Sequence, residues 1–186
     1  MGMHIDRFKC VVAALFLSSG ISLPALAQET DLDELHQQLS EADAVEAERL
    51  AGQIISTWER SGSPAMDLLL RRGKEALEQG QPDIAVEHFS ALVDHAPYFT
   101  EGYFGRASSY YLLGMTGPAL EDIQTVLRLN PLHFEAMTGL AIVLEELGRS
   151  QDALELYRMI LDIHPHSAPA LEATSRLELE LEGQAL

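Results

Sequence analysis

An internal repeat is the feature that most restricts the fold of this 186-residue chain. Three residue types recur with a period of 34 in one common register: proline at 97, 131 and 165, glycine at 80, 114 and 148, and alanine at 85, 119 and 153. A repeat of this length is one supersecondary unit, which buries its apolar face only by stacking on its neighbours. The sequence therefore predicts a stack of similar units with one continuous core.

The apolar residues within each unit follow the spacing of two helices. In the first unit a glycine, Gly80, separates two such runs: Leu68, Leu69, Ala76 and Leu77, then Ile84, Ala85, Phe89 and Leu92. Glycine accepts the left-handed backbone that ends a helix, and proline marks a boundary through which a helix cannot continue. The repeated alanine lets the two helices approach closely. Each unit is therefore predicted to be a helical hairpin.

These positions resemble the tetratricopeptide repeat (TPR) family, whose 34-residue helix-turn-helix units carry small and aromatic residues at fixed offsets and a closing proline. Four sites in each unit carry the resemblance: Gly73, Ala85, Phe89 and Pro97; Tyr103, Tyr110, Ala119 and Pro131; Leu140, Ala153, Tyr157 and Pro165. The departures are Arg72 and Arg106, where leucine is usual, and Met137 in place of the first aromatic residue. The resemblance implies an all-α fold, a TPR-type α-solenoid of helix-turn-helix repeats with a concave groove.

The repeat register divides the chain into segments. Three full repeats are expected at 66–99, 100–133 and 134–167. One repeat period closer to the N-terminus, Leu35, Leu39 and Trp58 fall on core positions, so 28–65 is interpreted as a degenerate, TPR-like helical pair that leads the stack. Residues 168–186 are expected to form a capping helix and a tail, since a stack must end in a polar face.

The N-terminal segment 1–27 has the order of a secretory signal peptide. Arg7 and Lys9 precede an apolar run that begins at Cys10, and an A-x-A cleavage site ends at Ala27. Several serines and a glycine interrupt this run, which is shorter than the roughly 20 apolar residues of a spanning helix. We expect cleavage after Ala27, export to the periplasm of a Gram-negative bacterium, and no stable membrane insertion of the mature chain.

Charge and motifs argue against several functions. The formal net charge of −17 is opposite in sign to that of a surface that binds nucleic acid. The only cysteine, Cys10, lies in the leader, and no nucleophile elbow, phosphate loop or paired zinc motif is present. Four histidines near repeat boundaries are expected to lie too far apart to share a metal. Adjacent acids such as Glu121 and Asp122 are expected to form a solvated helix face. We therefore expect neither catalysis nor a cofactor nor a metal.

The resemblance implies where a protein or peptide partner would bind. The family places ligand contacts on the groove face of each first helix, between the core positions. Carried over to this chain, these residues are Leu70, Lys74, Phe104, Ser108, Tyr111, Thr138, Ile142 and Glu145. Only Lys74 resembles the lysine and asparagine clamp that captures a terminal carboxylate, whereas Phe104 and Tyr111 suit an apolar or helical segment.

Two functions fit these features. The first is an adaptor or scaffold of the bacterial cell envelope that holds one partner segment in the groove. The alternative is a holdase-like periplasmic chaperone for exported proteins, which would use the same apolar groove for unfolded chains. The identity of the partner does not follow from the fold.

Overall fold

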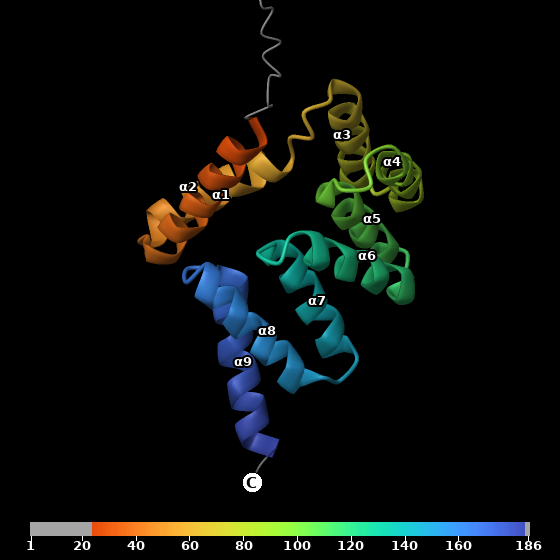
Figure 1. Ribbon diagram of the computed structural model, residues 1–186. Coiled ribbons are helices and arrows are strands. Elements are labelled where there is room, and N and C mark those ends of the chain that lie inside the picture. The colour runs from red at the N-terminus through yellow and green to blue at the C-terminus, as the bar shows by residue number, and fades with distance from the viewer. Residues whose placement is uncertain (1–23, 185–186) are drawn as a thin grey trace, which may run out of the picture.

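The computed structural model describes residues 24–184, which contain nine α-helices and no strand (Figure 1). The helices are α1 (Pro24–Glu41), α2 (Ala44–Trp58), α3 (Pro64–Glu78), α4 (Pro82–His95), α5 (Thr100–Leu112), α6 (Thr116–Leu129), α7 (Phe134–Glu146), α8 (Ser150–Ile163) and α9 (Ala168–Gln184). The all-α prediction is confirmed. Residues 1–23, which hold most of the expected signal peptide, and residues 185–186 lie outside the described residues.

Three helical hairpins, α3–α4, α5–α6 and α7–α8, follow the repeat period. Gly80, Gly114 and Gly148 end the first helix of each hairpin with φ of +69°, +73° and +71°. At the first of them the Gly80 amide donates to the Leu77 carbonyl at 2.9 Å, and the Gln81 amide donates to the Ala76 carbonyl at 2.9 Å. This pair of bonds satisfies the last carbonyls of α3 and reverses the chain, as the glycine spacing predicts.

Close helix contacts build the core of the repeats. Ala85 is fully buried, and so are its counterparts in the next two repeats, so all three small side chains lie in the core. The buried ring of Phe89 lies between two glycines of α3 and α5. A Cβ atom would come within 2.5 Å of this ring at Gly73 and within 2.4 Å at Gly105. These glycines therefore let two successive repeats close on one aromatic ring.

A partly buried ion pair joins the two helices of the second repeat. Arg106 Nε and Nη2 donate to the two carboxylate oxygens of Asp122, each at 2.8 Å. The side chain of Asp122 is 8% exposed, so the expectation that Glu121 and Asp122 both form a solvated face is wrong for Asp122. Arg106 occupies a position where the family usually has leucine, and an acid on the facing helix satisfies its charge.

The N-terminal hairpin, α1–α2, packs against the far end of the array. Leu39, Leu50 and Ile54 share one buried cluster with side chains of α7, α8 and α9. Trp58, at the end of α2, stacks on His133 just before α7, with 4.3 Å between ring centroids. Figure 1 shows the repeats curving from α3 to α9, with this hairpin across the open side of the arc. The hairpin thus closes the arc.

The expected position of this hairpin, as a leading repeat, would have covered the outer face of α3. That face can stay uncovered because its surface is polar. Arg71 is exposed there and forms an ion pair with Glu75. At the other end α9 packs on α8, and an exposed ion pair between Arg158 and Glu178 spans the two helices. None of the helices between residues 24 and 184 combines the length and hydrophobicity that a bilayer crossing requires.

Two glycine-to-alanine substitutions, one at a glycine that contacts Phe89 and one at an exposed glycine, should change stability in opposite directions. Gly105→Ala should lower the free energy of unfolding by about 2 kcal/mol, because the Phe89 ring is held from both sides and cannot move away. Gly52→Ala is the matched control: it lies on the exposed side of α2, with nothing within 4 Å of the added Cβ atom. It should raise stability by about 0.5 kcal/mol in urea unfolding. Equal effects of the two substitutions would contradict the packing described.

The docking of the N-terminal hairpin predicts a large effect at Trp58. Trp58→Ala should cost about 3 kcal/mol and speed amide hydrogen exchange in α1 and α2 more than in α3 and α4. Val45→Ala, at a residue of the same hairpin that is 83% exposed, should neither lower stability nor speed exchange in α1 and α2. Uniformly faster exchange along the chain would argue against the hairpin as a separately docked element.

Candidate functional site

The first helices of the second and third repeats enclose an apolar pocket of about 230 Å³ on the concave side of the array. We call it the array pocket. Its walls come from α5 and α7, with one residue from α6: Phe104, Ala107, Ser108, Tyr111, Leu112, Ile123, Gly139, Ile142 and Val143. None of these side chains is charged, so the pocket suits an apolar side chain. Leu112 and Ile142 at its mouth are 62% and 39% exposed.

A second pocket of about 290 Å³ lies beside it, and the N-terminal hairpin supplies one of its walls. We call it the composite pocket. It is lined by Ile55, Glu59, Leu70, Lys74, Leu77, Phe89, Glu101, Phe104, Gly105, Ser108 and Glu135. Phe104 and Ser108 belong to both pockets, so the two lie on either side of one turn of α5. Of these two pockets, the composite pocket has charged residues in its lining and the array pocket has none.

Six of the eight residues expected in the groove line these pockets. Tyr111 and Ile142 lie in the array pocket, Leu70 and Lys74 in the composite pocket, and Phe104 and Ser108 in both. Their binding of a partner stays a prediction, but the structure brings them together on one surface.

Several of these side chains already have partners within the protein. The Lys74 ammonium forms an ion pair with Glu59, and the Tyr111 hydroxyl donates to Glu146. That hydrogen bond raises the pKa of Tyr111. Leu70 is 5% exposed and packs in the core of the first repeat. Among the predicted groove residues, Phe104 and Ile142 therefore keep an accessible apolar surface.

Thr138 and Glu145 lie outside both pockets. Thr138 donates to the carbonyl of Phe134 within its own helix, at 2.9 Å. Glu145 faces α8 and α9, where it accepts from the Tyr157 hydroxyl at 2.9 Å and pairs with Arg176 at 2.7 Å. Burial and this hydrogen bond raise the pKa of Tyr157. Glu145 thus holds the third repeat to the capping helix.

His133 connects the hairpin with the floor of the groove. Its ring is fully buried, stacks on Trp58 and lies 4.8 Å from the ring of Phe104, between centroids. Nδ1 accepts from the amide of Ala136 at 3.2 Å, so the ring hydrogen is on Nε2, which lies 3.0 Å from a carboxylate oxygen of Glu101. A neutral imidazole therefore donates to Glu101 and caps α7.

Three acids occupy the same register of successive repeats, and the sequence reasoning missed them. Asp67, Glu101 and Glu135 recur at the repeat period, which is the signal that could have revealed them. Asp67 accepts two hydrogen bonds from Ser61 in the linker, and Glu101 accepts from His133. Glu135 has neither a hydrogen bond nor an ion pair within residues 24–184. Burial is the main cause that raises the pKa of its carboxyl group.

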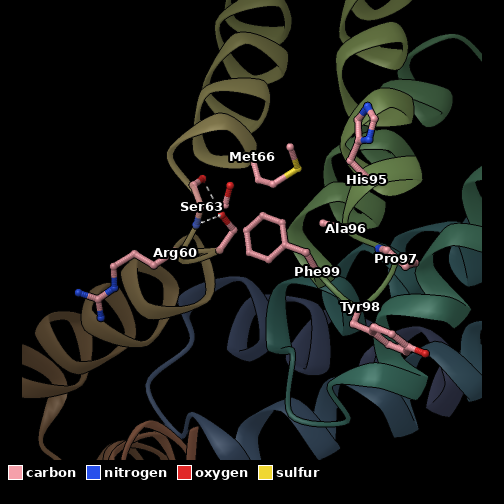
Figure 2. Close-up of a pocket in the computed structure, with 9 residues that line it drawn as sticks. Arg60, Ser63, Met66, His95, Ala96, Pro97, Tyr98 and Phe99 are labelled. Carbon is pink, nitrogen blue, oxygen red and sulfur yellow. Dashed lines mark hydrogen bonds between the residues drawn. The ribbon is translucent and has the colours of Figure 1, made fainter. Parts of the chain in front are cut away.

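A wider hollow of about 750 Å³ lies away from this groove, where the linker before α3 meets the turn between α4 and α5. Figure 2 shows Phe99 directed toward Ser63 and Met66, while Arg60 extends away from them. Its polar lining consists of Arg60, His95 and two serines, of which Ser61 donates to Asp67. Within the part of the chain that the structure describes, no set of three His, Cys, Asp or Glu residues is arranged to hold a metal.

The arrangement is suited to holding side chains. The array pocket offers apolar walls, and the composite pocket adds carboxylates beside an aromatic ring. The Ser108 hydroxyl, which belongs to both pockets, donates to the carbonyl of Phe104 within α5 at 3.0 Å.

Comparisons of sequence agree with the repeat architecture. The family model described as "Tetratricopeptide repeat" matches residues 70–115 and 119–168. A TPR repeat-containing protein of Rhizobium etli is 31% identical over 153 residues, which cover 82% of this chain and 75% of the relative. The small glutamine-rich tetratricopeptide repeat-containing protein 2 of Saccharomyces cerevisiae is 22% identical over 163 residues, 88% of this chain but 42% of the yeast protein.

Solved structures share the fold. The first TPR of Spaghetti (RPAP3) bound to the HSP90 peptide SRMEEVD aligns with a TM-score of 0.59 at 22% identity, over 63% of this chain and 93% of that one. The MamA protein aligns with a TM-score of 0.57 at 21% identity, over 86% of this chain and 84% of that one. The matched family model, the Rhizobium relative and the hairpin stack together show that the chain belongs to the tetratricopeptide repeat family, whose repeats generally serve as modules for protein–protein interaction.

Proposed function

We propose that this protein is a non-catalytic adaptor of the bacterial cell envelope that holds a segment of a partner protein in its concave groove. The observation that carries this proposal is the array pocket between α5 and α7. It is apolar and open at its mouth, and residues of two neighbouring repeats form it. An anchor side chain seated there would bury apolar surface, which is the main source of affinity in peptide grooves.

A structural neighbour supports a peptide as the kind of ligand, since the first TPR of Spaghetti was solved with an HSP90 peptide. That peptide, SRMEEVD, is acidic. In the present protein the groove has one lysine, Lys74, and Glu59 already pairs with it. The charges of this groove therefore do not favour an acidic C-terminus, and we propose a partner of different chemistry.

The proposed location in the envelope rests on the N-terminal sequence. Positive charge, a short apolar run and an A-x-A site ending at Ala27 form the pattern of an exported precursor.

This location makes a prediction about the N-terminus of the mature protein. Expressed in full length in a Gram-negative host, the chain recovered from the periplasm should begin at Gln28 by mass spectrometry. An Ala27→Arg variant should stay uncleaved, because the cleavage site requires a small residue. An intact N-terminus in the wild-type protein, or recovery from the cytoplasm alone, would count against the envelope proposal.

A holdase-like chaperone is the second candidate, and exposed apolar side chains near the array pocket favour it. Leu112, Leu113, Met115 and Leu147 lie at the turns that end α5 and α7, with exposed fractions between 42% and 62%. Such a surface could hold many unfolded chains instead of one partner.

Site-specific crosslinking in the native host distinguishes the two candidates. A photoreactive residue at Ile142, at the mouth of the array pocket, should capture one dominant protein if the adaptor proposal is correct. Met159, which is 51% exposed on α8, provides the matched control and should capture nothing comparable. Many unrelated exported proteins at Ile142 would favour the chaperone. The same products at both positions, or none at Ile142, would contradict a groove function.

A further inference from the structure

The composite pocket combines apolar walls with uncompensated negative charge. Glu59, Glu101 and Glu135 line it, and Lys74 is the one basic residue among its lining side chains. Lys74 pairs with Glu59, and the neutral ring of His133 donates to Glu101. The lining thus carries three acids against one lysine, and an excess of negative charge attracts a cation.

Glu135, which is partly buried, is the acid of this pocket to which the structure gives no hydrogen bond or ion pair within the described residues, although its two counterparts in the repeat register have such partners. Burial disfavours its charged form and raises the pKa of its carboxyl group. A cation placed beside Glu135 would offset this cost, because a charge-assisted hydrogen bond is stronger than a neutral one.

The walls of the pocket fit the aliphatic part of a basic side chain. Leu77, Phe104 and the hairpin residue Ile55 supply apolar surface next to the carboxylates. Lysine and arginine characteristically lay their methylene chains along such surfaces and direct the charged end to a polar group. The aromatic ring of Phe104 also offers a favourable contact for a cation.

The neighbouring array pocket sets the spacing of a ligand that uses both sites. The two pockets share Phe104 and Ser108, so two side chains of a short segment can enter them together. Residues three or four apart on a helix lie about 5–6 Å from each other, and residues two apart on a strand lie about 7 Å from each other. An apolar anchor and a basic residue within four positions meet this requirement.

We propose that the groove recognises a protein segment with a bulky apolar residue for the array pocket and a lysine or arginine, within four positions of it, for the composite pocket. This inference rests on the proposed function of the groove and names the chemistry of its partner. The N-terminal hairpin is part of the binding site, because Ile55 and Glu59 form one wall of the composite pocket.

Selection from a phage library of random dodecapeptides tests the proposal on the folded chain from Gln28 onward, the predicted mature form. Peptides enriched on the wild-type protein should pair an aromatic or aliphatic residue with lysine or arginine within four positions. Fluorescence anisotropy then measures the Kd of an enriched peptide. Glu135→Gln should weaken binding about tenfold. Glu87→Gln, the same change at an exposed residue of α4, should have no effect.

The outcomes separate this inference from the function on which it rests. Enriched peptides without a basic residue, or an unchanged Kd in Glu135→Gln, would overturn the inference and leave a groove that binds apolar segments. Ile142→Glu should abolish binding in either case, because it places a charge at the mouth of the array pocket. A complete lack of enrichment on the wild-type protein would contradict the proposed groove function and the inference with it.

Discussion

One buried histidine joins the parts of this protein on which the groove depends. His133 caps α7 through Nδ1, donates from Nε2 to Glu101 of α5, and stacks on Trp58 of the N-terminal hairpin. The cap makes Nδ1 an acceptor, which places the ring hydrogen on Nε2. These contacts connect the second repeat, the third repeat and the hairpin. This ring therefore helps to position the hairpin, and with it one wall of the composite pocket, together with the buried cluster that the hairpin shares with α7, α8 and α9.

Much of the fold could be predicted because the features that recur with the repeat period depend on interactions between residues close together in the sequence. The glycines at 80, 114 and 148 adopt the left-handed backbone that their spacing predicts, and Ala85 and its counterparts are fully buried. Such features depend on residues within one hairpin or on its neighbour. Six of the eight groove residues also line the observed pockets, since a fixed register places them on the same face of each first helix.

The contacts that escaped prediction join residues outside that period. Leu39, Ile54 and Trp58 have the same apolar pattern whether the hairpin precedes α3 or packs against α8, so periodicity alone could not place it. The polar surface of α3 was the available signal. The pairing of Arg106 with Asp122 was missed for a related reason, because a helical pattern records which residues share a face but not which charges meet across a turn.

A partner bound in the composite pocket, as proposed, would couple its binding to the stability of the protein through the hairpin. A ligand in the composite pocket would contact Ile55 and Glu59 on one side and α5 and α7 on the other. Such a ligand would bind more tightly to the protein with the hairpin docked than to the protein with the hairpin released. The free energy by which docking increases the affinity for the ligand equals the free energy by which the bound ligand stabilises docking. Any change that loosens Trp58 from His133 should then weaken a partner that uses both pockets more than one that uses the array pocket alone.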